Sequence, residues 1–299
     1  MVASSKLHHA QVAIQNMLPY EELLEHILRS FLAADAEAKT IYDQVRPIKR
    51  VAIVVFSSNS SLCGGFNANV IKKMMHVHDD FAAQVGAENI DIYPVGRKVT
   101  EKAQKLGYQV KCDLSAMVDK PNVKDCIDLA KELGGRFANG EVDRVEVIYH
   151  HFKSAGSQIL TQKTFLPIDV AGELDRDHER DLSSNIATRK SQEYLRQRRT
   201  AEHKESEKVE TVPLNDNFIV EPNMNTVLSI LMPKLAHLML YTCLLDSVAS
   251  EHAARMVAMQ TATDNADELL RQLNLQYNKS RQQAITNELL DIVGGSVNN

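Results

Sequence analysis

The sequence predicts an α/β fold in which a small, mostly parallel, Rossmann-like domain is inserted between two long helices that pair as an antiparallel coiled coil. Three observations lead to this prediction: a three-four spacing of apolar residues at the start of the chain, β-branched runs alternating with helical segments in the middle, and a heptad pattern in the last quarter. The expected regions are an N-terminal coiled-coil helix (1–45), the α/β domain (51–170), a charged insertion (171–212) and a C-terminal coiled-coil helix (218–295).

The N-terminal helix is indicated by one apolar stripe whose members recur every three or four positions. These residues are Leu7, Ala10, Ile14, Met17, Leu24, Leu28 and Phe31. The pattern predicts helix from the first residue to about residue 45, with a kink at Pro19, whose ring removes a backbone donor.

The middle of the chain alternates between two periods. Runs rich in β-branched residues predict strands, and the segments between them have helical spacing. The strands are 51–56, 90–95, 145–151 and 158–168, and the helices are 67–86, 97–107 and 122–138. Such alternation predicts a parallel sheet that is covered on both faces.

The insertion at 171–212 holds ten acidic and nine basic residues. Its basic stretch RQRR, at 196–199, suggests a nucleic-acid patch, but acidic neighbours cancel its field and the whole chain has a net charge of -5. We therefore expect a solvated extension here and no nucleic-acid partner.

The C-terminal helix carries the longest pattern. Its heptad positions from Leu228 to Ala284 are mostly apolar, and His252 is a polar seam residue expected to fix the register. A helix over 224–293 would be roughly 100 Å long, and Gly294-Gly295 is expected to end it. The segment YNKSRQQAITNELLDIVGG is apolar on several faces, so we expect the tip to enter another protein.

The chain shows no sign of a membrane span, a metal site or a disulfide framework. No apolar run approaches the ~20 residues that cross a bilayer, and the His8-His9 and His150-His151 pairs hold neighbours that point in different directions. The four cysteines are far apart without a C-x-x-C pair, which fits a reducing cytoplasm. They are Cys63, Cys112, Cys126 and Cys243.

The stretch VAIVVFSSNSSLCGGFNANV, at 51–70, resembles the start of a nucleotide-binding fold, because a strand is followed by glycines and then a helix. It lacks both G-x-x-x-x-G-K-[ST] and G-x-G-x-x-G. The interpretation favoured here is a tight strand-to-helix turn with no cofactor.

Three stretches resemble the gamma subunit family of the F-type ATP synthase, the central rotor shaft: MVASSKLHHAQ, SSLCGGFNANV, and EHAARMVAMQTATDNADELLRQLNLQYNKSRQQAITNELLDIVGG. The resemblance covers nearly everything except 171–212. It implies a non-catalytic subunit that couples proton-driven rotation of a membrane ring to ATP synthesis by the beta subunits. The implied partners are the alpha, beta and epsilon subunits and the membrane c-ring. The implied location is peripheral, on the cytoplasmic face of a bacterial inner membrane.

The resemblance also implies contact residues. Arg281, Gln282 and Thr286 in RQQAIT match polar contacts to the beta subunits, and Arg255 in ARMVAM matches an arginine implicated in coupling. Glu221 in VEPN matches the foot that rests on the membrane ring, although the aromatic positions preceding it in some relatives are Phe218 and Val220 here.

Two other functions remain open from the residues themselves. One is a cytosolic α/β enzyme or nucleotide-binding protein that uses its helices as an oligomerisation stalk. The other is a passive tether, which would tolerate substitutions at Arg281 and Gln282.

We expect the natural subunit to begin before Met1. The family has roughly two dozen residues ahead of MVASSK that continue the helix, and Met1 starts directly in helical pattern without a Ser, Thr, Asp or Asn cap. The intact mass of the subunit from native enzyme tests this, since a mass matching a start at Met1 in a fully coupled complex contradicts it.

Overall fold

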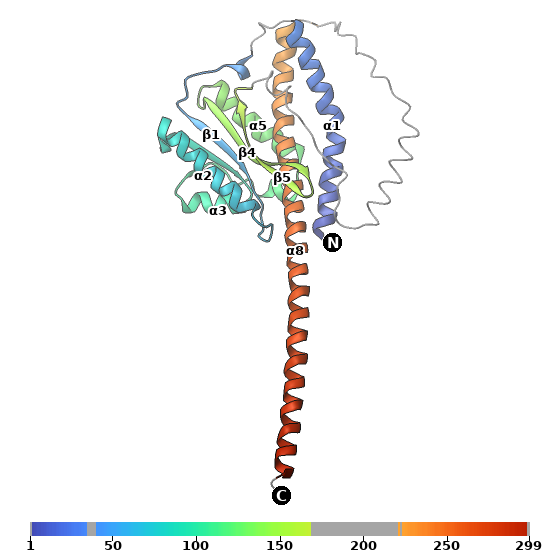
Figure 1. The fold of residues 1–299 in the computed structure, drawn as a ribbon. Coiled ribbons are helices and arrows are strands. Elements are labelled where there is room, and N and C mark those ends of the chain that lie inside the picture. The colour runs from blue at the N-terminus through green and yellow to red at the C-terminus, as the bar shows by residue number, and fades with distance from the viewer. Residues whose placement is uncertain (1, 35–39, 169–220, 222, 298–299) are drawn as a thin grey trace, which may run out of the picture. The chain divides into compact units, whose positions relative to one another are not determined.

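The computed structural model describes residues 2–34, 40–168, 221 and 223–297 (Figure 1). The chain forms two compact units, Met1–Met256 and Val257–Asn299. The charged insertion expected at 171–212 lies outside the described residues.

The first unit is built on a five-stranded sheet with strand order β3-β2-β1-β4-β5. The strands are β1 (Val51–Phe56), β2 (Ile90–Val95), β3 (Gln109–Val110), β4 (Arg144–Ser154) and β5 (Ser157–Leu166). The pairs β1–β2, β1–β4 and β2–β3 are parallel, whereas β4 and β5 form an antiparallel hairpin. The predicted α/β fold with a mostly parallel sheet is therefore confirmed; β3, with two residues, is too short to leave a periodic signal.

Side chains of β1 alternate between two apolar layers, as the period of a strand requires. Val51, Ile53 and Val55 pack in one cluster with α2 (Phe66–Val85) and α3 (Arg97–Lys105). Ala52, Val54 and Phe56 pack in the other, which includes α5 (Val123–Ala138) and the two long helices. Short elements complete the unit: α4 (Ala116–Asp119) and the 3-10 turns η1 (Ile41–Asp43) and η2 (Ala87–Asn89). Because both faces are covered, every residue of β1 and β2 is buried.

The long helices are α1 (Val2–Ala34) and α8 (Met224–Val297), and α1 runs antiparallel to the first part of α8 (Figure 1). Leu7, Ile14 and Leu28 of α1 are fully buried, as are Leu240 and Leu244 of α8. The Thr242 hydroxyl lies 3.6 Å from the Met17 sulfur. The predicted coiled-coil seam therefore forms within the first unit.

Two predicted helix ends are wrong. α1 ends at Ala34, and residues 41–43, which were predicted to be helical, form η1 instead. There the Thr40 N–H donates to Asp43 Oδ1 (3.1 Å) and the Tyr42 carbonyl accepts from the Ile168 N–H (2.8 Å). These local and tertiary bonds replace the helical ones, so propensity alone placed the boundary too late.

At the other end α8 continues past Gly294-Gly295 to Val297. Glycine permits the left-handed stop but does not impose it, and costs only about 1 kcal/mol relative to alanine inside a helix.

The expectation that no segment is apolar enough to span a bilayer is also wrong, as judged by length and composition. Among the described residues one helix, over Asn225–Leu290, is long and apolar enough to cross a membrane. However, 56% of its most apolar window is buried inside the fold. The core helix of a globular domain has the same property.

His150 on β4 gives the first unit a sensitivity to acid. Its ring stacks on Phe66, with 4.3 Å between centroids, and burial lowers its pKa to about 4. The unfolded chain binds this proton below about pH 6.5 and the folded chain does not, so stability falls as the pH drops from 6.5 towards 4. The expected loss is about 2 kcal/mol at pH 5.

His150→Phe keeps the stacked ring and removes the charge, so urea unfolding at pH 7 and pH 5 should show a smaller acid-induced loss than in the unchanged chain. The control is His8→Gln, at an exposed position on α1. An equal loss in the His150 variant and the parent would contradict the assignment.

Candidate functional site

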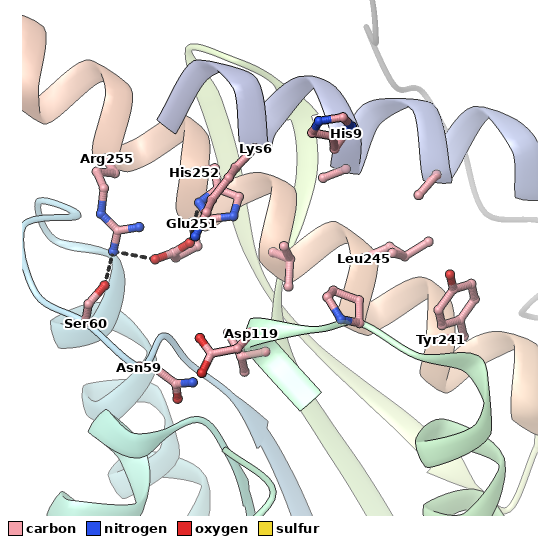
Figure 2. A pocket seen from close by; sticks show the side chains of 15 residues that line it. Lys6, His9, Asn59, Ser60, Asp119, Tyr241, Leu245, Glu251, His252 and Arg255 are labelled. Carbon is pink, nitrogen blue, oxygen red and sulfur yellow. Dashed lines mark hydrogen bonds and ion pairs between the residues drawn. The ribbon is translucent and has the colours of Figure 1, made fainter. Parts of the chain in front are cut away.

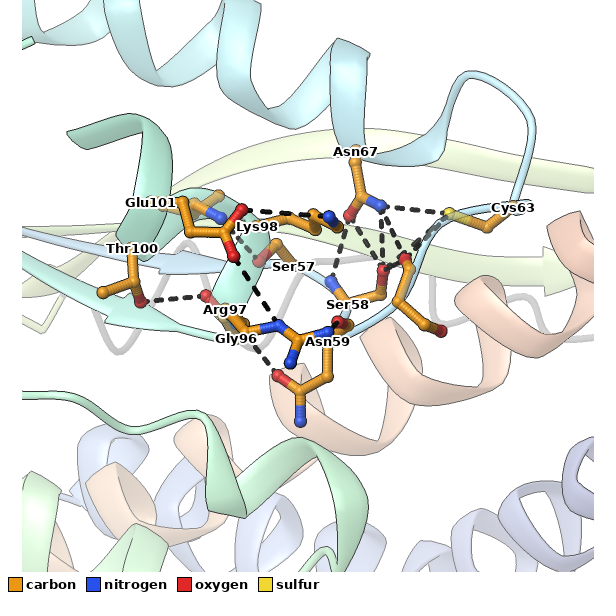
Figure 3. Close-up of polar contacts among 12 residues, drawn as sticks. Ser57, Ser58, Asn59, Cys63, Asn67, Gly96, Arg97, Lys98, Thr100 and Glu101 are labelled. Carbon is orange, nitrogen blue, oxygen red and sulfur yellow. Dashed lines mark hydrogen bonds and ion pairs between the residues drawn. The ribbon is translucent and has the colours of Figure 1, made fainter. Parts of the chain in front are cut away.

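The loop that follows β1 lies at the carboxyl ends of parallel strands, where α/β proteins commonly bind ligands. β1 lies between β2 and β4, so the strand order reverses beside it. The loop is filled by the side chain of Asn67 (Figure 3). Asn67 Oδ1 accepts from the buried Ser58 N–H (3.1 Å), and Nδ2 donates to Ser58 Oγ (2.8 Å) and to the Ser60 carbonyl (3.2 Å).

The ends of β1 and β2 are also in close contact. The Ser57 N–H donates to the Val95 carbonyl (2.7 Å), and the Val99 N–H donates to Ser57 Oγ (3.2 Å). Gly96 has a φ of +113°, and a Cβ there would lie 2.4 Å from the Ser57 carbonyl oxygen. A side chain is therefore excluded at Gly96. The loop's polar groups are bonded to one another, which supports the interpretation of SSLCGG as a tight turn.

A second cluster forms where α8 meets this loop (Figure 2). Arg255 Nη2 lies 2.5 Å from Glu251 Oε1 and donates to Ser60 Oγ (2.6 Å) and to the Ser61 carbonyl (3.3 Å). Burial alone would raise the pKa of the Glu251 carboxyl. The neighbouring His252 and Arg255 lower it by more, so its pKa lies below the usual value. Glu251 is therefore a carboxylate at neutral pH, held between two basic groups.

Beside this cluster is a cavity of about 280 Å³. Its walls come from α1, α8, the loop after β1 and the end of α4, and include Lys6, Asn59, Asp119 and Leu245 (Figure 2).

The two histidine pairs lie in different surroundings. His8 and His9 are both exposed, whereas His150 is buried and His151 Nδ1 lies 2.7 Å from Asp246 Oδ2 on α8. Across the described part of the chain, no three His, Cys, Asp or Glu side chains form a group that could hold a metal ion.

The predicted tip residues lie on the second unit. Arg281, Gln282 and Thr286 are exposed, and Thr286 Oγ1 donates to the Gln282 carbonyl (2.8 Å) one turn earlier. Large apolar side chains around this unit are also exposed: Leu269, Leu270, Leu273, Leu275, Tyr277, Ile285, Leu289, Leu290 and Ile292. An apolar surface of this extent marks a contact with another protein. Glu221, the predicted ring contact, is exposed, and Phe218 and Val220 lie outside the described residues.

Sequence reasoning missed the polar contacts between α8 and the α/β domain. They are Asp246–His151, Ser250 Oγ to the His150 carbonyl (3.1 Å), and Arg255–Ser60. The sequence did contain one indication of these contacts. Asp246 and Glu251 stand in an apolar stretch of the helix, and a buried carboxylate needs a polar partner. The partners themselves lie about a hundred or more residues away.

A paired-helix stalk with an inserted α/β domain and a bare apolar helix defines a scaffold that works inside a larger assembly. The family model for ATP synthase matches residues 1–297. The ATP synthase gamma chains of Phocaeicola vulgatus and Bacteroides thetaiotaomicron are 48% and 47% identical to it over 297 residues, covering 99% of this chain and 91% of each relative. The chain belongs to the ATP synthase gamma chain family, as its resemblance to that family predicted.

A solved structure has a similar fold. A chain in the cryo-EM structure of the Euglena gracilis mitochondrial ATP synthase (OSCP, F1 and c-ring) matches with a TM-score of 0.50 and 18% identity, over 98% of this chain and 94% of that one.

Asn67→Ala should destabilise the first unit by about 1–3 kcal/mol, because it leaves the buried Ser58 N–H without its acceptor. Urea unfolding measures the loss. Asn69→Ala, at an exposed position two residues along α2, is the matched control and should be neutral. Equal stability of the two variants would show that Asn67 does not hold the loop.

Proposed function

We propose that this gamma chain is the central rotor shaft of a proton-translocating ATP synthase and catalyses no reaction itself. The observation that best supports this proposal is that the second unit is a helix whose apolar side chains are exposed on several faces. Such a helix is suited to a surrounding partner, which we infer to be the hexamer of alpha and beta subunits.

The division of labour follows the regions expected from sequence. The part of the 218–295 segment that lies in the second unit, from Val257 onwards, enters the hexamer. The α/β domain at 51–170 joins the epsilon subunit and the c-ring. Glu221 contacts the ring, and the 171–212 segment is an appendage. The protein is peripheral, on the cytoplasmic face of the bacterial inner membrane, with no membrane insertion and no nucleic-acid partner.

Arg281, Gln282 and Thr286 are the proposed contacts to the beta subunits. Gln282 and Thr286 are one turn apart on one side of the helix, and Arg281 lies about 100° around it from Gln282, so the three contacts together span about 140° of the helix surface. Arginine presents a rigid fork of donors suited to carboxylates. The resemblance implies a beta contact for Arg255 as well, whereas the bonds of its Nη2, to Glu251, Ser60 and Ser61, lie within this chain.

The runner-up is an α/β enzyme or nucleotide-binding protein with an oligomerisation stalk. It expects the isolated chain to bind or turn over a nucleotide. The rotor proposal expects no turnover by the isolated chain, and coupled ATPase activity only when alpha and beta subunits are added. Reconstitution of the hexamer with and without this chain separates the two.

Arg281→Ala should lower coupled ATP synthesis by about tenfold, the effect of losing roughly 1–2 kcal/mol at an interface arginine. Synthesis driven by a proton gradient in vesicles measures it, with thermal unfolding of the subunit as the check on folding. Asn287→Ala is the control, because Asn287 is exposed and lies about 100° or more around the helix from each of the three proposed contacts. Normal synthesis by the Arg281→Ala/Gln282→Ala double variant would refute the proposed contact and favour a passive tether.

A further inference from the structure

Three polar contacts join α8 to the α/β domain within ten residues of helix. Asp246, with 0% exposed side chain, lies 2.7 Å from His151 of β4. One turn later Ser250 donates to the His150 carbonyl (3.1 Å). Arg255, anchored by Glu251, donates to Ser60 and Ser61 of the loop after β1.

These contacts are made from different sides of the helix. At 3.6 residues per turn, Asp246 and Ser250 lie within about 40° of each other, whereas Glu251 and Arg255 lie about 140° and 180° around from Asp246. One side faces β4 and the other faces the loop after β1. A roll of α8 about its own axis would therefore have to break polar bonds on both sides.

The apolar contacts of α8 cannot supply this constraint alone. Burial of Leu244 or Ala249 resists separation of the helix from its neighbours. Because the hydrophobic effect is non-directional, it tolerates a small roll or slide that keeps the same area buried. Charge-assisted hydrogen bonds depend on distance and angle, and they resist such motion.

We propose that Asp246–His151, Ser250–His150 and Glu251–Arg255–Ser60 form a clamp that fixes the rotation of α8 about its own axis relative to the α/β domain. Arg255 then acts in coupling as a positioning residue, through Ser60 of its own chain. The clamp lies at the end of the first unit, before the helix continues as Val257–Val297. Torque that enters at the α/β domain passes through it into that helix.

This inference rests on the proposed rotor function, and assembled ATP synthase in inverted membrane vesicles is the material for its test. The readout is the number of protons pumped per ATP hydrolysed, a ratio that a lower amount of complex does not change. Ser60→Ala removes one acceptor on an exposed loop, and Arg255→Lys keeps the charge but loses the fork.

We expect each substitution to lower the pumping ratio by about fivefold, and the Ser60→Ala/Arg255→Lys double variant to be no worse than either, since both break one contact. Ser60→Thr retains a hydroxyl and should keep the ratio. Asp246→Asn tests the other side of the helix and should lower the ratio as well.

The matched control is Arg144→Lys, because Arg144 Nε pairs with Glu146 Oε1 at 2.7 Å inside the α/β domain, in a pair formed between two residues of β4. It should leave the ratio unchanged.

A normal ratio in Ser60→Ala together with a low ratio in Arg255→Lys would overturn the clamp and assign Arg255 to a partner subunit. Normal ratios in all variants would overturn it outright. Coupled pumping by a hexamer and ring lacking this chain would instead refute the rotor function itself, so the two failures are distinguishable.

Discussion

A helix that is apolar on more than one face has to be covered on more than one face, and this constraint governs α8. In the first unit the requirement is met internally, because α1 and the sheet bury Leu240, Leu244 and Ala249 completely. In the second unit it is not met within the chain, where Leu270, Leu275 and Leu290 are 58%, 61% and 63% exposed. One helix thus serves as the core of a globular unit and as the surface offered to an assembly.

The polar groups on the buried part of α8 are consistent with this dual use. Carboxylates in an apolar contact are costly, and Asp246 and Glu251 are present with basic partners 2.7 and 2.5 Å away. Apolar residues of similar volume often pack a site of this kind with no loss of stability, so such polar pairs are weak evidence for a role in stability. These polar pairs lie at the end of the first unit, just before the exposed part of α8. Their position indicates that they serve to orient α8 relative to the α/β domain.

Much of the fold was readable from local pattern. β1 and β2 have the predicted bounds because continuous β-branched runs are confined between a charged segment and a glycine or serine loop. Local reasoning failed where tertiary bonds decide, as at Thr40 and Tyr42, where η1 replaces helix. It also failed for Asp246–His151 and Arg255–Ser60, since their pairing depends on the sheet order. The tip residues Arg281, Gln282 and Thr286 came from family resemblance, because no period distinguishes a contact residue on an exposed helix.

The pairing of α1 with α8 has a consequence for how the chain is made. Met17 and Thr242 touch across 225 residues of sequence, so the first helix to leave the ribosome has its partner only after almost the whole chain has been synthesised. Until then Leu7, Ile14 and Leu28 have no internal cover, and closing so long a loop is slow. The β1–β2 pair joins segments much closer in sequence and can form first. Biogenesis therefore leaves a period in which the N-terminal helix is open to chaperones and proteases, and any stop codon before α8 leaves that helix without its partner.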